Sequence, residues 1–253
     1  ATLFPVQYYK EMLSDTAVSD YDLYVDSPFA EENRLLVAAT DVSSRYTRRG
    51  RKEYERMAAY IRDIIRGKHG NYMVFFPSYQ LMKDVFEVFT EMELMKAGHG
   101  LQLVVQESEM SEDARQKFLD AFQADAADAV IGFCVMGGIF SEGIDLTQDR
   151  LIGAMIVGTG IPQVCNEREI LKQYFGAEGF DYAYLYPGMN KVLQAAGRVI
   201  RTRKDRGVIL LMDERFQSPH YRKMFPREWS DCRRCTMENV TELLTEFWKK
   251  DPT

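Results

Sequence analysis

Short apolar runs alternate along the chain with longer stretches whose apolar residues recur at helical spacing. Seven of the short runs are rich in β-branched and aromatic residues and are predicted to be strands. Several are apolar at every position, which is typical of strands buried on both faces of a parallel sheet. The predicted strands are RLLVAA (34–39), NYMVFFP (71–77), LQLVVQ (101–106), DAVIGFCV (128–135), LIGAMIVG (151–158), YAYLY (182–186) and GVILLMD (207–213).

The intervening stretches predict helices with recognisable ends. The segment 51–67 stops at Gly67, while 78–98 and 111–123 open on the capping residues Ser78 and Ser111. The tail 236–250 is predicted to be a closing amphipathic helix. This alternation of strands and helices predicts an α/β domain over residues 34–253, preceded by an irregular N-terminal arm or linker over 1–33.

Composition supports an ordinary globular core, since 46% of the 253 residues are hydrophobic. No apolar run reaches the roughly 20 residues of a membrane helix, and the first residues lack the pattern of a signal peptide. We therefore expect a soluble, cytoplasmic protein. The net charge is −6, yet basic residues gather in 45–52 and 191–206 and acidic ones in 107–128, so the surface potential is predicted to be strongly asymmetric.

Two loops are candidates for phosphate contact. Ser78 and Tyr79 follow a predicted strand at a helix N-terminus, which suits an anion but equally suits a plain helix cap. Arg48 and Arg49 belong to the basic stretch RYTRRGRK, which fits either a solvated loop or a loop that contacts a nucleic-acid backbone. Both alternatives stay open for both loops.

Two further segments carry candidate chemistry. The glycines of GGIFSEGIDL allow tight turns or close approach to a ligand, and Glu142 and Asp145 add carboxylates. Gln194, Gly197, Arg198 and Arg201 fall at i, i+3, i+4 and i+7, which predicts that they share one face of a helix. Arginines grouped in this way suit a polyphosphate.

The four cysteines do not predict a metal site. Cys134 and Cys165 lie among apolar residues and are expected in the core. Cys232 and Cys235 are spaced like metal ligands, but a second pair at matching distance is missing from the sequence.

The ordered set ATLFPVQYY, DSPF, NYMVFFPSYQ, GGIFSEGIDL and QAAGRVIRTRKDRGVILLMDERF resembles the C-terminal motor half of DinG-like and XPD-like DNA helicases of the second helicase superfamily. The resemblance covers nearly the whole chain. Motif III of that family ends in Ser-Ala-Thr-Leu, and the chain starts at Ala1-Thr2-Leu3, as though cut inside it. Motif IV would lie at 76–80, motif V at 138–146 and motif VI at 194–201.

The resemblance implies a RecA-like three-layer α/β/α domain with a mostly parallel central sheet, the second helicase domain of the P-loop NTPase fold. It also implies an ATP-dependent DNA helicase, with a role in DNA repair or replication. The resemblance implies that Arg198 and Arg201 act as arginine fingers on ATP, with Gln194 beside them. It implies cofactor-binding roles for Glu142, Gly143 and Asp145, where Glu142 and Asp145 couple the ATP site to DNA, Asp145 lies toward the nucleotide and Glu142 lies nearer the strand. The single-stranded DNA contacts that it implies are Ser78, Tyr79, Ser141, Arg48 and Arg49.

Half of such a motor's ATP site is missing from this sequence. It contains no G-x-x-x-x-G-K-[ST] loop and no Asp-Glu pair placed to hold Mg²⁺, and the pair Asp213-Glu214 at the end of the last strand is expected to be structural. ATP and Mg²⁺ are therefore expected to be held mainly by an N-terminal helicase domain of the same full-length chain. This chain alone is expected to be inactive in hydrolysis.

Two other classes of function compete with this interpretation of the sequence. A non-hydrolysing nucleic-acid-binding or protein-interaction module with a helicase-like fold stays open as the alternative. A dinucleotide-dependent oxidoreductase is disfavoured because the sequence has no G-x-G-x-x-G turn between an early strand and a helix.

Overall fold

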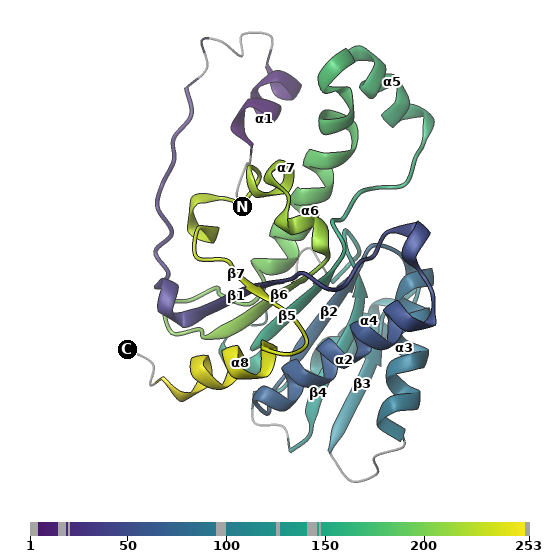
Figure 1. Ribbon diagram of the computed structural model, residues 1–253, viewed down its shortest axis with the longest axis vertical. Helices are drawn as coiled ribbons and strands as arrows, with labels where there is room; N and C mark the ends of the chain where they lie inside the picture. Colours follow the sequence, from purple (N-terminus) through teal and green to yellow (C-terminus); the bar gives the residue numbers. More distant parts are fainter. Residues whose placement is uncertain are drawn as a thin grey trace.

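A parallel sheet forms the centre of the protein in the computed structural model, which describes residues 5–14, 19, 21–94, 100–124, 127–140, 146 and 148–250. The sheet has seven strands in the order β3-β4-β2-β5-β6-β1-β7, and every neighbouring pair runs parallel (Figure 1). The strands are β1 (Arg34–Ala39), β2 (Tyr72–Phe76), β3 (Leu101–Val105), β4 (Ala129–Val135), β5 (Gly153–Val157), β6 (Gly207–Met212) and β7 (Arg233–Cys235).

Helices cover both faces of this sheet. The helices are α1 (Val6–Leu13), α2 (Arg51–Gly67), α3 (Tyr79–Leu94), α4 (Glu112–Asp120), α5 (Asn166–Tyr174), α6 (Tyr186–Ala196), α7 (Pro219–Arg222) and α8 (Val240–Lys249). One apolar cluster joins one sheet face to α2, α3 and α8, and a second joins the other face to α4, α6 and the segment around α7. The RecA-like three-layer prediction is confirmed.

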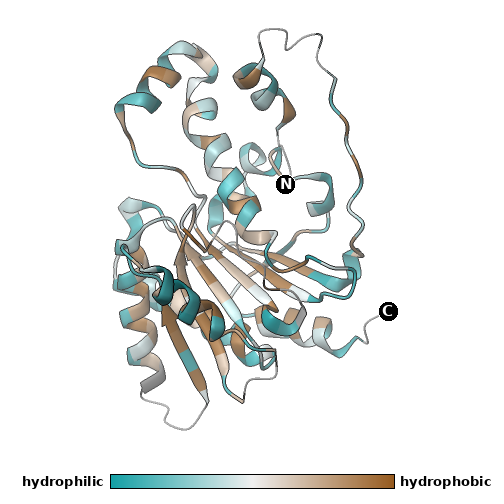
Figure 2. Ribbon diagram, turned by 180° about the vertical axis from the view of Figure 1, so that it is seen from behind, coloured by the Kyte–Doolittle hydropathy of each residue, from teal (hydrophilic) through white to brown (hydrophobic). Residues whose placement is uncertain are grey.

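Strand residues divide between these two clusters by simple alternation. Phe76 packs in the first cluster and its neighbour Phe75 in the second, and both are fully buried. Strands that bury both faces need apolar residues at every position, which is the pattern of β2, β4 and β6. In Figure 2 the strands are accordingly mostly brown, whereas the helices that cover them carry teal residues.

The predicted strand YAYLY is wrong. Residues Asp181–Leu185 form a π-helical turn that runs directly into α6. Tyr182 packs against Tyr8 of α1, and the Tyr184 hydroxyl donates to Glu169 of α5 over 2.6 Å. The alternating tyrosines imitate a strand, but their rings are buried between helices rather than beside a sheet.

The N-terminal arm is less irregular than predicted. It contains α1, whose Glu11 accepts a hydrogen bond from the hydroxyl of Tyr182. In Figure 1, α1 lies beside the start of α6, at the same end of the molecule as α5, and the ring of Tyr8 contacts those of Tyr182 and Tyr186. The strand β7 was missed, because Arg233 and Arg234 give it no apolar signal and it is specified only by its pairing with β1.

The remaining strand predictions are confirmed, and they bring the candidate loops together. The carboxyl ends of parallel strands meet at one edge of the sheet, so the loops that follow β1, β2, β4 and β6 lie along that edge. No helix in the described part of the chain is both long and apolar enough to span a bilayer.

Candidate nucleotide and nucleic-acid site

The segment with the two candidate arginines is a helix end rather than a continuous helix. Helix α6 stops at Ala196, where the N–H of Gly197 still reaches the carbonyl of Leu193 over 2.9 Å. The N–H of Arg198 then bonds to Ala195, three residues back. The prediction that all four motif residues share one helical face is therefore wrong beyond Gly197, because glycine is a poor helix former and the chain tightens into a turn there.

Asp205 fixes the backbone that carries Arg201. Its buried carboxylate accepts the N–H groups of Arg201 and Thr202, each over 2.7 Å, and the hydroxyl of Thr202 over 2.7 Å. A carboxylate that collects successive N–H groups holds a turn rigidly. The sequence analysis does not single out this residue, because a lone aspartate in a basic stretch gives no distinctive pattern.

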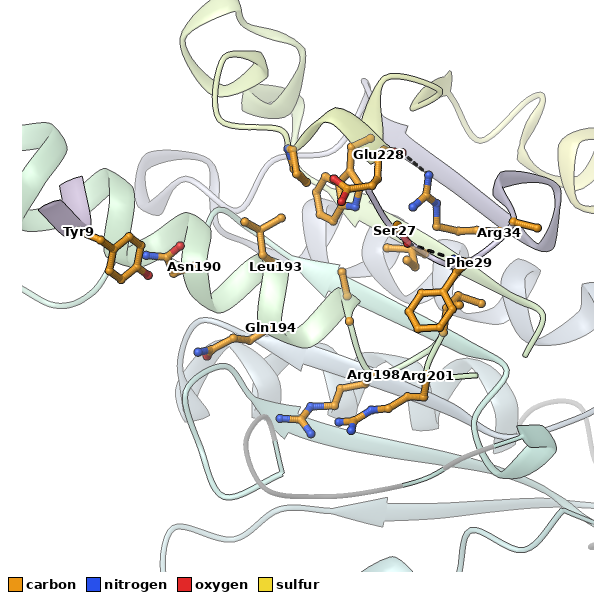
Figure 3. A pocket seen from close by; sticks show the side chains of 17 residues that line it. Tyr9, Ser27, Phe29, Arg34, Asn190, Leu193, Gln194, Arg198, Arg201 and Glu228 are labelled. Carbon is orange, nitrogen blue, oxygen red and sulfur yellow. Dashed lines mark hydrogen bonds between the residues drawn. The ribbon is translucent and has the colours of Figure 1, made fainter. Parts of the chain in front are cut away.

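Figure 3 shows Arg198 and Arg201 extending side by side, with their guanidinium groups toward the same side. Both line a cavity of about 550 Å³, together with the exposed Gln194 on the last turn of α6. Tyr9 and Phe29 of the N-terminal arm and Trp229 form other parts of the wall. The structure thus brings Gln194, Arg198 and Arg201 of the predicted motif VI together at one surface, and two neighbouring guanidinium groups suit a polyphosphate.

The glycine-rich loop begins at the carboxyl end of β4. Gly137 has φ of 71°, a conformation that favours glycine, and a side chain there would meet Lys191 of α6 at 3.0 Å. A Cβ on Gly138 would come within 2.7 Å of the Gln106 side-chain nitrogen. The candidate residues Ser141, Glu142, Gly143 and Asp145 lie outside the described residues.

Ser78 caps α3, which is one of the two alternatives left open above. Its hydroxyl accepts the N–H of Leu81 over 3.3 Å. Tyr79, the first residue of α3, keeps 38% of its surface exposed, so its ring faces solvent. Its hydroxyl donates to the carbonyl of Glu107 over 3.3 Å.

Gln106 also lies in this region, although the sequence pattern does not predict a role for it. It is 3% exposed, and its side-chain nitrogen donates to the Tyr79 hydroxyl over 2.9 Å. Its side-chain oxygen accepts the N–H of Val135 over 3.0 Å. A glutamine at the end of an apolar strand gives no pattern in the sequence; only its burial and its partners reveal it.

The basic loop after β1 is tied into carboxylates. Arg48 donates to Glu53 over 2.6 Å and to Glu214 over 2.9 Å. Arg49 donates to the carbonyl of Ser44 over 3.3 Å and lies 5.5 Å from the ring centre of Tyr46. The two arginines therefore differ: the charge of Arg48 is balanced locally, while Arg49 stands beside an exposed aromatic ring.

A buried ionic cluster anchors this loop to β6. The fully buried carboxylate of Asp213 accepts the N–H and hydroxyl of Ser44, over 2.9 and 2.7 Å, and the guanidinium of Arg215. Burial tends to raise the pKa of Asp213, but the bonds from Arg215 and Ser44 outweigh it and lower the pKa below 3.8. The expected structural role of Asp213 fits this geometry.

Cys232 precedes the short edge strand β7 and Cys235 is its last residue, and the two differ in exposure. Cys235 is buried beside β1, whereas Cys232 is partly exposed. The part of the chain that the structure describes contains no group of three or more His, Cys, Asp or Glu side chains that could hold a metal. The prediction that Cys165 lies in the core is wrong, since it is exposed at the start of α5.

Comparison with solved structures supports the fold alone. A solved structure of apo XPD superposes with a TM-score of 0.64 at 24% identity, covering 80% of this chain and 40% of that one. The structure of Xpd4 from S. tokodaii gives a TM-score of 0.57 at 16% identity, over 89% of this chain and 42% of that one.

The sequence relatives include proteins named as helicases and one named as an exonuclease. A probable ATP-dependent helicase of Methanocaldococcus jannaschii is 26% identical over 77% of this chain and 31% of its own length. The ATP-dependent DNA helicase XPD of Sulfolobus acidocaldarius is 28% identical over 72% of this chain and 32% of its own. The 3'-5' exonuclease DinG of Bacillus subtilis is 24% identical over 89% of this chain and 24% of its own.

The chain thus spans about a third or less of these relatives. Residues 61–232 match the profile described as the helicase C-terminal domain, which is more than half of the chain. This match includes β2, β4, the glycine-rich loop and the arginine turn after α6. The chain belongs to the helicase C-terminal domain family, with relatives among the DinG-like and XPD-like helicases.

Proposed function

We propose that this chain is the C-terminal motor domain of an ATP-dependent DNA helicase of the DinG and XPD type. The observation that carries the proposal is the pair Arg198 and Arg201, which project side by side from the turn after α6 (Figure 3). They lie within residues 61–232, which match the helicase C-terminal domain, at the positions that the resemblance assigns to motif VI. A cytoplasmic location and a role in DNA repair or replication belong to the same proposal.

The two arginines act on the γ-phosphate of an ATP that is bound mainly by an N-terminal RecA-like domain. When bound, ATP and Mg²⁺ supply the hydrolysable bond and the charge neutralisation that phosphoryl transfer needs. Arg198 and Arg201 then stabilise negative charge that develops in the transition state. Asp205 keeps the backbone of Arg201 in place, and Gln194 stands on the adjacent helical turn.

The carboxyl edge of the sheet forms part of a track for single-stranded DNA. The exposed ring of Tyr79 can stack on an unpaired base, and Ser78 and Arg49 lie at loops that suit backbone phosphates. Arg48 has a supporting role through Glu53 and Glu214. Ser141, Glu142, Gly143 and Asp145 of the glycine-rich loop couple this track to the nucleotide, as the family motif implies.

The experiment is a comparison of two chains in a DNA-stimulated ATPase assay. This 253-residue chain is expected to show no turnover above background, because the sequence lacks a phosphate-cradling loop and a Mg²⁺-binding pair. A chain that adds an N-terminal RecA-like domain is expected to hydrolyse ATP when single-stranded DNA is present. Steady turnover by the short chain, free of contaminants, would overturn the division of the ATP site.

The same assay separates the alternative. A longer chain that binds single-stranded DNA but never hydrolyses ATP identifies a binding module with a motor fold instead.

A further inference from the structure

Gln106 connects the end of β4 to Tyr79, in the segment that follows the neighbouring strand β2. It follows β3 directly, and its own N–H still pairs with the carbonyl of Phe133 on β4 over 2.8 Å. The next ladder bond is made by the side chain, whose oxygen accepts the N–H of Val135 over 3.0 Å. In a parallel ladder a main-chain carbonyl would normally take that place, so the side chain of Gln106 extends the sheet by one bond after the backbone has left it.

This bond fixes which way the carboxamide faces. The N–H of Val135 needs an acceptor, so the oxygen must point to β4 and the nitrogen must point away from it. The nitrogen then lies 2.9 Å from the hydroxyl of Tyr79, to which it donates. A second bond, from that hydroxyl to the carbonyl of Glu107, restricts the ring from the other side.

The glycine-rich loop packs against the same carboxamide. A Cβ on Gly138 would stand 2.7 Å from the Gln106 nitrogen and 3.2 Å from its oxygen, so no larger residue fits there without moving Gln106. Gln106 is itself 3% exposed. One buried side chain therefore touches the exposed ring of Tyr79, the end of β4 and the loop that follows it.

We propose that Gln106 is a positioning residue for single-stranded DNA: it holds the ring of Tyr79 ready for an unpaired base and ties that ring to the glycine-rich loop. This inference rests on the proposed DNA track. A ring that is already ordered loses less side-chain freedom when a base stacks on it. Loss of the hydrogen bonds of the Tyr79 hydroxyl is expected to weaken binding of single-stranded DNA about fivefold, because the free-energy cost of ordering one side chain on binding is on that scale.

The test measures affinity of the full 253-residue chain for fluorescent oligothymidylate at low salt, by anisotropy. Tyr79→Phe removes the hydroxyl and keeps the ring and the Val135 bond, so the fold is left intact. Gln106→Met removes both side-chain bonds. If Gln106 acts through Tyr79, each single variant binds about fivefold more weakly, and the double variant binds no worse than either single one.

Gln102→Met is the matched control, because Gln102 lies exposed on the same strand. It is expected to bind like the parent chain, and urea unfolding checks that every variant is folded. Unchanged affinity in Tyr79→Phe, or additive losses in the double variant, would overturn the positioning role while leaving the DNA track standing. A parent chain that fails to bind oligothymidylate would overturn the DNA track itself and the positioning role with it.

Discussion

The partly exposed guanidinium of Arg215 and the fully buried carboxylate of Asp213 form an ion pair at the carboxyl end of β6, with Nε 2.8 Å from Oδ1. The same carboxylate receives the hydroxyl and N–H of Ser44, in the loop after β1. Two neighbouring strands are thus joined just beyond their last residues. Ser44 belongs to the same loop as Arg48 and Arg49, so we expect the ion pair to hold that loop in place.

The first prediction concerns the stability that this pair gives. Asp213→Asn keeps the size of the side chain but leaves the guanidinium of Arg215 without its counter-charge, so the free energy of unfolding is expected to fall by about 3 kcal/mol. Urea unfolding measures it. Glu55→Gln is the control, because the ion pair of Glu55 with Arg51 is exposed at the surface and is expected to contribute less than about 1 kcal/mol. Equal losses in the two variants would contradict the structural role of Asp213.

The second prediction is the pH dependence of that loss. The pKa of Asp213 is lowered in the folded protein, so its contribution is complete above the unfolded value of 3.8 and is lost as the pH falls through the lower, folded pKa. The difference in free energy of unfolding between parent and Asp213→Asn is therefore expected to be constant near neutrality and to shrink below pH 3.8. A difference that grows on acidification would show that the carboxylate is not stabilised by folding.

The third prediction concerns the four thiols. Burial raises the pKa of Cys235 to about 12 and that of Cys232 to about 11, and it raises the pKa of the fully buried Cys134 further. Cys165 is exposed. At pH 8 an aromatic disulfide reagent is expected to modify Cys165 quickly and the other thiols only after unfolding. Rapid modification of both Cys232 and Cys235 in the native protein would instead indicate an accessible pair.

Particular residues show why most of the fold follows from the sequence. Strands such as β2 and β4 are apolar at every position, and only a strand buried on both faces requires that. The segment 182–186 has the same apolar and aromatic composition as a strand, but it is helical. Its tyrosines pack on α1 and α5 rather than on a sheet. Local pattern cannot distinguish two partners that are distant in the chain.

The candidate site divides in the same way. Arg198, Arg201 and Gln194 were predicted together from their spacing, and they do line one cavity, although the helix ends before the arginines. Gln106 and Asp205 were missed. Gln106 makes its three hydrogen bonds to segments that are distant in the chain, so its partners are set by tertiary structure. Asp205 bonds to Arg201 and Thr202, four and three residues back, but a lone aspartate in a basic stretch gives no pattern that marks such a turn.

The fourth prediction tests the DNA track through salt. Binding of oligothymidylate is expected to be weak, without base preference, and to fall steeply as salt rises. Arg49→Ala is expected to reduce the slope of log affinity against log salt by about 0.7, the value for one phosphate contact on a single strand. Lys249→Ala removes an exposed charge from α8 and serves as the control. A DNA affinity that does not change with salt, or the same salt slope in Arg49→Ala and Lys249→Ala, would argue against a phosphate contact at Arg49.

The arginine turn after α6 carries the central claim, and it is tested in a chain that includes the N-terminal RecA-like domain. Arg198→Ala and Arg201→Ala each remove a guanidinium that stabilises negative charge developing in the transition state. Turnover of ATP is therefore expected to fall about 10³-fold, while ATP affinity stays within about tenfold of the parent value. Lysine at either position is expected to rescue poorly, because it keeps the charge but loses the planar fork. Binding of single-stranded DNA is expected to survive in both variants.

The most direct measurement is the steady-state rate of DNA-stimulated ATP hydrolysis by Arg201→Ala, read beside its ATP affinity from nucleotide titration. The account predicts lost turnover with retained ATP binding. Hydrolysis at a near-parental rate in both Arg201→Ala and Arg198→Ala would show that the turn after α6 does not face a nucleotide, and would contradict the motor assignment.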